Sequence, residues 1–231
     1  LIGSFFLGQS SLEASTKALE SDAKSSLTAV RDITAIQITD YFNTIKDQSI
    51  TVSSNLMTVD AMEAFSFGFK THNANQDSAT VNTQRKSVKK FYSKEFGDRF
   101  KTLNYGESAQ INQLFSPLSD TTVALQYDFI SNNKTPLGSK QLLSDLGKFT
   151  SYNQAHRKFH DTFAEFIDKF GYYDLFLVDL ESGDLVYSVF KELDYATSLR
   201  TGPYANSGIG KAFKLSAEAM DKDFIGITDF D

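Results

Sequence analysis

The sequence predicts an α+β protein in which a long N-terminal helix and a helical bundle precede an antiparallel sheet module. Residues 11–56 contain neither Pro nor Gly, and their apolar side chains recur at helical spacing. Residues 60–170 continue with shorter helical patterns separated by polar turns. After Gly171 the pattern changes to short runs of aromatic and branched residues, which are typical of β-strands. Helices followed by strands indicate an α+β fold.

The first helix is predicted from Ser11 to Leu56. At about 1.5 Å per residue it would extend roughly 65 Å, more than one globular domain needs. This length suits a stalk that pairs with a second copy of the chain, so we expect a homodimer through this helix. A helix that folds back on its own chain is the alternative. Polar side chains interrupt the stripe and favour a loosely packed bundle over a strict coiled coil. The stripe consists of Leu12, Leu19, Ala23, Leu27, Val30, Ile38, Tyr41, Ile45 and Val52.

The apolar, uncharged segment Leu1–Gly8 admits two interpretations. It is too short to span a bilayer, which takes about 20 residues. It is either the outer end of a transmembrane helix or the apolar start of a soluble one.

The remaining elements follow from turn and cap signals. Helices are predicted at about 60–70 with Asp60 as the cap, and at about 79–103, 120–130, 152–170 and 209–219. Strands are predicted at 172–178, 185–190 and 224–228, the first two forming a hairpin around the turn at 180–184. We therefore predict three parts: a stalk helix with a bundle (1–106), a helical connector (107–170) and a sheet module (171–231).

Composition and motifs argue against several classes of function. The formal net charge of −6 argues against a nucleic-acid binder, and the absence of Cys removes disulfides and thiol catalysis. His156 and His160, four residues apart, could share a metal ion, but no further ligand accompanies them, and ordinary polar or pocket-lining roles are favoured. The Gly-x-Gly-Lys run ending at Lys211 lacks the other residues of a phosphate loop. We expect no enzyme activity, cofactor or metal.

One segment carries a candidate binding site. Between Val186 and Tyr204, charged side chains and aromatic hydroxyl groups gather near the end of a predicted strand, namely Tyr187, Lys191, Asp194, Tyr195 and Tyr204. Such groups could line a pocket for a polar ligand. A salt-bridged, solvated loop is the alternative.

The same region carries a family resemblance. The stretch GYYDLFLVDLESGDLVYSVFKELDYATSLRTGPYANSGIG (171–210) resembles the membrane-distal, PAS-like module of double Cache sensor domains. Three upstream segments are similar to the same family: LTAVRDITAIQITDYFNTIKDQ, FYSKEFGDRFKTLN and TSYNQAHRKFHDTF. Such domains occur in methyl-accepting chemotaxis proteins, sensor kinases and nucleotide cyclases.

The resemblance implies the sensor region of a bacterial chemoreceptor. This region would lie in the periplasm or extracellular space, between two helices that anchor the receptor in the inner membrane, and would dimerise through its long first helix. A small molecule would bind the PAS-like module, and binding would displace helices. The pocket would combine the five residues above with Asp229 and, from the preceding helix, Tyr152 and His156.

Two departures from the family qualify this expectation. The Arg–aromatic pattern of amino-acid-binding members is absent, and Lys191, Asp194 and Tyr195 stand in the corresponding loop, so an amino-acid ligand is in doubt. The family also continues with two more strands, so we expect the sheet module here to be incomplete. The other candidate function is a helical interaction domain that senses through a periplasmic binding protein.

Overall fold

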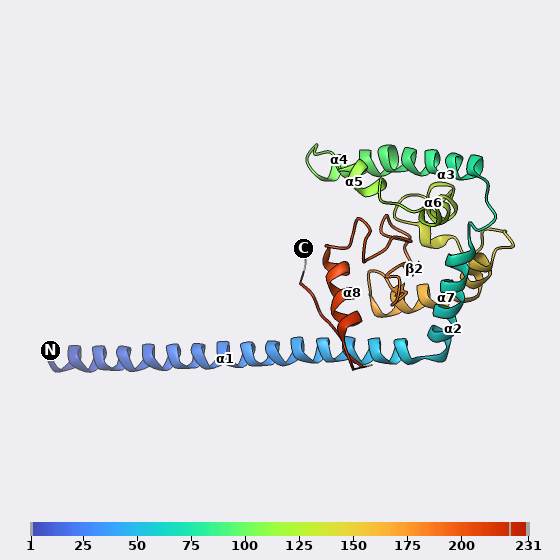
Figure 1. Cartoon of the computed structure of the whole chain (residues 1–231). Helices are drawn as coiled ribbons and strands as arrows, with labels where there is room; N and C mark the ends of the chain where they lie inside the picture. Colours follow the sequence, from blue (N-terminus) through green and yellow to red (C-terminus); the bar gives the residue numbers. More distant parts are fainter. Residues whose placement is uncertain (1, 222, 230–231) are drawn as a thin grey trace. The chain divides into compact units, whose positions relative to one another are not determined.

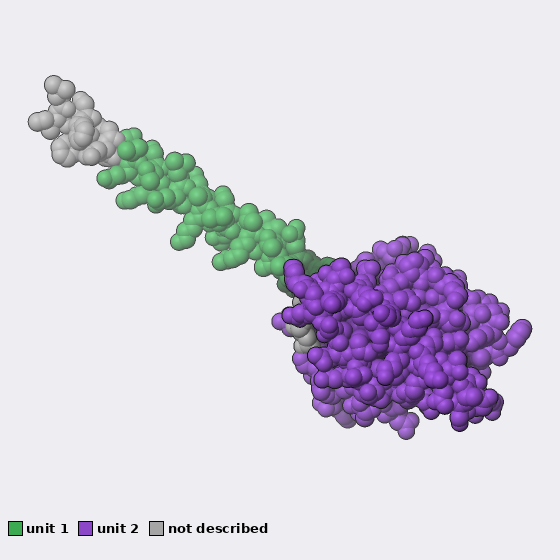
Figure 2. All heavy atoms as spheres, turned by 90° about the horizontal axis from the view of Figure 1, so that it is seen from above, with its two compact units in different colours: residues 1–52 green, residues 53–231 purple. Residues whose placement is uncertain are grey.

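The computed structural model describes residues 2–221 and 223–229, with side chains from residue 11 onward. The protein is mostly helical, with one small antiparallel sheet (Figure 1). Two compact units divide it at Val52 and Ser53, and Figure 2 colours them separately. This confirms the long N-terminal helix, the helical bundle and an antiparallel sheet.

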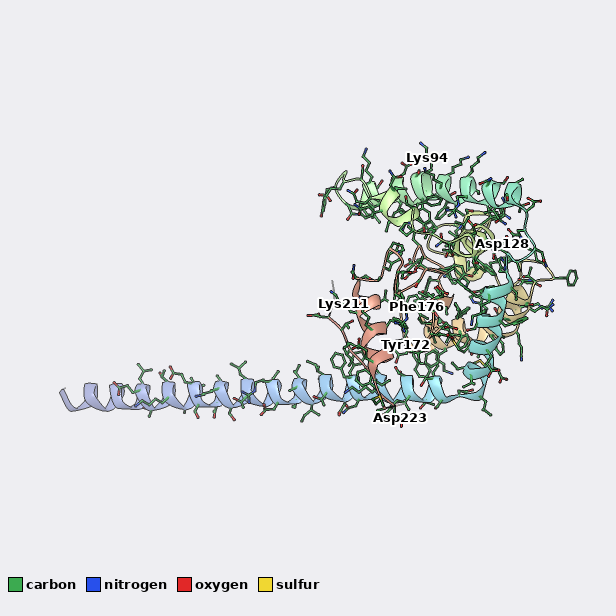
Figure 3. The ribbon with its side chains drawn as sticks, viewed as in Figure 1. Lys94, Asp128, Tyr172, Phe176, Lys211 and Asp223 are labelled. Atoms are coloured by element: carbon green, nitrogen blue, oxygen red, sulfur yellow. The ribbon has the colours of Figure 1, made fainter. Side chains whose placement is uncertain are left out.

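Helix α1 (Ile2–Ser54) is the predicted long helix. Its apolar stripe is exposed: Leu12, Leu19 and Leu27 retain 68%, 70% and 71% of their accessible surface. Figure 3 shows the side chains of α1 standing out around the helix. The interpretation of Leu1–Gly8 falls outside the described side chains. Among the described residues, no helix combines the length and apolar character needed to cross a bilayer.

Helix α2 (Leu56–Thr71) begins four residues before the predicted cap, Asp60. Asn55 caps it instead, because its side chain accepts a hydrogen bond from the backbone N–H of Met57 at 2.8 Å. An amide oxygen at an extended residue satisfies a free donor of the first turn, so the helix can begin there.

Helix α7 (Ser151–Phe170) packs against α2 and matches the prediction. Thr150 caps its start, and Gly171, with φ of 73°, ends it in the left-handed conformation. The two helices approach most closely at Gly68, where a Cβ atom would lie 2.7 Å from the Cα atom of Tyr152.

The helices between α2 and α7 form the bundle. The predicted helix at 79–103 is confirmed as α3 (Ser78–Phe91), a π-helical turn η1 (Tyr92–Phe96) and α4 (Gly97–Leu103). The helix at 120–130 is confirmed as α6 (Asp120–Gln126) and a second π-helical turn η2 (Tyr127–Ser131). The short helices α5 (Ile111–Phe115) and η3 (Lys140–Leu142) were not predicted.

The sheet is a hairpin of β1 (Phe176–Val178) and β2 (Leu185–Ser188), shorter than predicted and followed by α8 (Gly208–Glu218). The predicted third strand at 224–228 is wrong, because that segment forms no strand. The other edge of β2 is occupied: the N–H of Leu185 donates to the carbonyl of Thr197 at 2.9 Å. The N–H of Ala196 returns a bond to the carbonyl of Leu185 at 3.2 Å.

Candidate functional site

A pocket of about 410 Å³ lies between the bundle and the loop that follows β2. Its bundle wall is apolar and comes from α3, η1, α4, α5, η2 and the segment after η2; Figure 1 shows α3, α4 and α5 along one side of the second unit. Lys191, Asp194 and Tyr204 line the other side, with Glu192 and Leu193. The bundle wall consists of Phe91, Phe96, Phe100, Leu114, Ile130 and Leu137.

Asp174 positions the start of the loop. Its carboxylate accepts hydrogen bonds from the Ser188 hydroxyl at 2.7 Å and from the backbone N–H of Val189 at 2.9 Å. Burial raises the pKa of Asp174, and these donors act in the opposite direction. The loop then turns sharply at Lys191, whose φ of 58° is rare for a residue with a side chain.

The bundle holds the end of the loop. The side-chain amide of Gln126 donates to the carbonyls of Leu193 at 3.0 Å and Tyr195 at 2.8 Å. The Thr122 hydroxyl donates to the Ala196 carbonyl at 2.7 Å. Because these donors are buried side chains of α6, they fix the position of the loop relative to the bundle wall.

Asp194 presents a buried carboxylate. Its Oδ1 atom is inaccessible to solvent and has no hydrogen-bond partner among the described residues. Burial raises the pKa of Asp194 to about 7, and the neighbouring carboxylates of Asp174 and Glu192 add to that rise, while the backbone N–H groups of Asp194 and Tyr195 oppose it. A buried acceptor without a donor lowers the free energy of unfolding by about 1–3 kcal/mol, so this oxygen destabilises the fold unless a ligand donates a hydrogen bond to it.

Lys191 precedes Asp194 in the same loop and is also buried, but its charge does not neutralise the Asp194 carboxylate. Its Nζ atom donates to the carbonyls of Ser188 and Val189 and lies 4.6 Å from the centroid of the Tyr187 ring. Burial lowers the pKa of Lys191 to about 7, opposed by the charge of Asp174. Its charge is directed to the core rather than to the pocket carboxylate.

Four other predicted site residues lie in the core and do not line this pocket. Tyr152, His156, Tyr187 and Tyr195 are fully buried. The Tyr195 hydroxyl donates to that of Tyr152 at 2.8 Å, which donates to the Val186 carbonyl at 2.6 Å. Burial raises the pKa of both tyrosines. They form a support layer behind the loop.

The two histidines belong to this support layer too. Their rings stack with centroids 4.2 Å apart. His160 donates from Nε2 to the Gln141 carbonyl at 2.6 Å, so its Nδ1 accepts from the Tyr187 hydroxyl at 2.7 Å. Burial lowers the pKa of His160 to about 4, helped by the charge of Lys191. Both nitrogens of His160 are therefore engaged in the protein.

Two more residues complete the account of the predicted site. Tyr204 lines the pocket, and burial raises its pKa. Asp229 is exposed and is not among the residues that line the pocket.

Sequence reasoning missed the aromatic wall. Phe91 and Phe96 are five residues apart, a spacing that would place them on different faces of an α-helix. The π-helical turn at 92–96 brings both to the pocket, with Phe100 at 5.7 Å from Phe96 between ring centroids. The aromatic residues were visible in the sequence, but the extra residue in the turn was not.

A buried ion pair in the bundle lies outside the pocket. Asp128, labelled in Figure 3, contacts His72 Nε2 at 3.2 Å and accepts a hydrogen bond from Lys148. Burial acts to raise the pKa of Asp128, but the bonds from His72 and Lys148 hold it below its ordinary value. The Asp128 carboxylate has protein partners on both oxygens, so we assign it a structural role.

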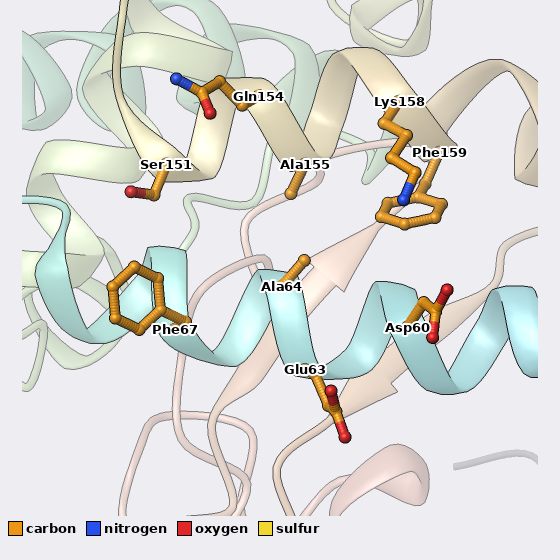
Figure 4. A pocket seen from close by; sticks show the side chains of 9 residues that line it. All are labelled: Asp60, Glu63, Ala64, Phe67, Ser151, Gln154, Ala155, Lys158 and Phe159. Atoms are coloured by element: carbon orange, nitrogen blue, oxygen red, sulfur yellow. The ribbon is translucent and has the colours of Figure 1, made fainter.

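A second hollow is a wide groove between α2 and α7 (Figure 4). Asp60, Glu63 and Phe67 line it from α2, and Gln154, Lys158 and other residues line it from α7. Phe67 keeps 61% of its surface exposed. The charged side chains of this groove are exposed to solvent, whereas the carboxylate of Asp194 is buried.

Comparison with protein families, curated proteins and solved structures gives no match to this chain. Function is therefore inferred from the pocket geometry and from the residues that line it.

Proposed function

We propose that this chain is the extracytoplasmic ligand-sensing region of a bacterial transmembrane chemoreceptor. The observation that carries the proposal is the pocket in which three of the loop residues expected to bind a ligand, Lys191, Asp194 and Tyr204, meet an aromatic wall. Pockets for small molecules are mostly apolar with a few well-placed polar groups, and this one has that composition. In this proposal the chain binds a small molecule and carries out no chemistry on it.

The origin of the walls supports sensing. One wall belongs to helices, turns and a following segment between Phe91 and Leu137, and the other to the loop from Lys191 to Tyr204. A ligand that contacts both walls binds most tightly when they are close, so it shifts the population towards that arrangement. Differential affinity of this kind is what a receptor needs to transmit occupancy as helix displacement.

The exposed stripe of α1 supports the receptor architecture. Apolar side chains within one stripe favour pairing with the same stripe of a second copy. The resemblance to double Cache domains supports the same arrangement, with a homodimer anchored in the inner membrane and the PAS-like module in the periplasm or extracellular space.

A thermal-shift screen of the full chain tests the proposal. Ligands should include amines, organic acids, amino acids and neutral aromatics, because a ligand at a hundred times its Kd stabilises a protein by about 2.7 kcal/mol. Leu137→Trp should fill the pocket and abolish the shift, whereas Leu180→Trp at the exposed hairpin turn should keep it. A shift that survives Leu137→Trp would place the ligand elsewhere.

The groove between α2 and α7 favours a second candidate, sensing through a partner protein. It is open and combines the exposed Phe67 ring with charged groups, as protein interfaces do. Phe67→Asp should then abolish binding of a ligand-loaded periplasmic protein, measured by surface plasmon resonance, without changing any thermal shift by small molecules. Binding that is indifferent to Phe67→Asp would dismiss this candidate.

A further inference from the structure

We infer that the ligand of this pocket is a small organic cation, a protonated amine attached to an apolar body, with Asp194 as its counter-ion. The inference rests on the proposed function, because it names the ligand class of the same site. Three features of the pocket lead to it: the carboxylate that lines it, the direction of the neighbouring lysine and the chemistry of its wall.

The first feature is the unused acceptor. Asp194 lines the pocket, and its buried Oδ1 atom has no hydrogen-bond partner within the part of the chain that the structure describes. Buried polar atoms in folded proteins are nearly always paired, so an exception at a cavity points to a missing donor. A donor that also carries positive charge offsets the cost of burying a carboxylate most effectively.

The second feature is that the protein does not supply that cation itself. Lys191 is the lysine that lines the pocket, yet its Nζ atom donates to two carbonyls and faces aromatic rings. Glu192 adds a second carboxylate, which accepts a hydrogen bond from the Tyr173 hydroxyl at 2.8 Å. The carboxylates of Asp194 and Glu192 that line the pocket are negative and no pocket cation neutralises them among the described residues, so an anion would be repelled.

The third feature is the wall opposite Asp194. Three phenylalanine rings and three aliphatic side chains would surround the body of the ligand. Aromatic faces attract an ammonium group through their quadrupole, and they also favour contact with hydrocarbon. A volume of about 410 Å³ accepts a molecule of modest size but leaves little room for a peptide.

A matched series of probes tests the inference on the full chain. Phenethylamine, 2-phenylethanol and 3-phenylpropanoate share an aromatic body and differ in the charge of the head group. We expect the amine to bind at least tenfold more tightly than the alcohol, and the acid to bind most weakly, measured by calorimetry and ligand-observed NMR. Charge-assisted hydrogen bonds stabilise more than neutral ones, which sets this order.

Variants distinguish a failure of the cation inference from a failure of the proposed binding site. Asp194→Asn should weaken amine binding by roughly tenfold or more and leave the alcohol nearly unchanged. Asp98→Asn, at an exposed position of α4 that does not line the pocket, should change neither. Equal affinities for amine and alcohol, both lost in Leu137→Trp, would overturn the cation inference and leave the pocket as the binding site. Failure of all three probes to bind, or binding unchanged in Leu137→Trp, would overturn the proposed site as well.

Discussion

The Nζ atom of Lys191 lies 4.6 Å from the centroid of the Tyr187 ring, and no ion pair joins it to Asp194 among the described residues. The rings of Tyr195 and Phe129 lie 5.7 Å and 5.9 Å from the same atom. Two opposite charges of one loop are therefore buried separately, one against aromatic faces and one at the pocket. The titration of each of these two side chains makes the free energy of unfolding depend on pH, over a different pH range for each.

Lys191→Met should stabilise the protein relative to wild type most strongly at and below about pH 7. Burial lowers the pKa of Lys191 from 10.5 to about 7, so between these values the unfolded chain binds a proton that the folded chain has released. The wild-type free energy of unfolding therefore rises with pH over this range, by up to about 1.4 kcal/mol per unit, and the variant lacks that rise.

Urea unfolding at intervals between pH 7 and pH 10 measures this difference. The advantage of Lys191→Met over wild type should shrink as pH rises. Lys86→Met, at an exposed position of α3, is the matched control and should follow wild type throughout. A constant difference between Lys191→Met and wild type would mean that Lys191 titrates normally.

Asp194→Asn should change the pH dependence of stability at lower pH than Lys191→Met does, and in the opposite direction. Burial raises the pKa of Asp194 from 3.8 to about 7, with Asp174 and Glu192 contributing, so between these values the folded chain binds more protons than the unfolded chain. This effect lowers the wild-type free energy of unfolding as pH rises from about 4 to 7. The variant should gain on wild type across that range, by up to about 1.4 kcal/mol per unit, and keep the gain above it.

Chemical denaturation at pH 4, 5.5 and 8 tests this expectation, with Asp98→Asn as the control. A variant that is more stable at pH 8 yet binds amines more weakly would mean that the carboxylate is retained for binding at a cost in stability. If the free energy of unfolding depends on pH in the same way in Asp194→Asn and wild type, the pKa of Asp194 is not raised by burial.

The sequence predicted most helices because their signals are local. Gly171 ends α7 as expected, and the Pro- and Gly-free run forms α1. The missed features depend on distant contacts. The strand expected around Gly226 does not form, and residues 196 and 197 instead pair with the free edge of β2. In the site, Lys191, Asp194 and Tyr204 line one pocket, and their binding of a ligand stays a prediction.

The remaining site residues show the limit of such reasoning. Tyr152 and His156 were expected at the pocket because tyrosine and histidine often face ligands, but here the Tyr152 hydroxyl and the His156 Nδ1 atom bind the carbonyls of Val186 and Ser144 in the core. Residue type does not distinguish the two roles, since both require a buried ring with a polar tip. The direction of a side chain within a packed core depends on neighbours that are far away in sequence.

Leu27→Glu should dissociate a dimer formed through α1. Leu27 keeps 71% of its surface exposed within a stripe that includes Val30 and Tyr41, and a buried charge at such a seam is costly. Sedimentation of the wild-type chain should give a mass near twice the monomer value of 25.8 kDa at high concentration, and the variant should remain monomeric. Ser25→Glu, on the opposite face of the helix, should still dimerise. A monomeric wild type at all concentrations would contradict pairing through α1.

Gly68→Ala should destabilise the protein although alanine is the better helix former. An added Cβ atom would lie 2.7 Å from the Cα atom and 2.8 Å from the backbone nitrogen of Tyr152, so α2 and α7 would have to separate. Backbone atoms cannot rotate away as a flexible side chain does. We expect a loss of roughly 1–3 kcal/mol, which outweighs the gain of about 1 kcal/mol in helix propensity.

Gly97, at the start of α4, provides a control for that prediction. A Cβ atom there meets the Tyr92 carbonyl oxygen at 3.2 Å, a contact that a shift of a few tenths of an ångström relieves. Gly97→Ala should therefore cost much less than Gly68→Ala in guanidinium unfolding. Because Tyr152 belongs to the layer behind the pocket loop, Gly68→Ala should also weaken amine binding, whereas Gly97→Ala should weaken it less. Equal stabilities of the two variants would mean that α2 and α7 are not in close backbone contact at Gly68.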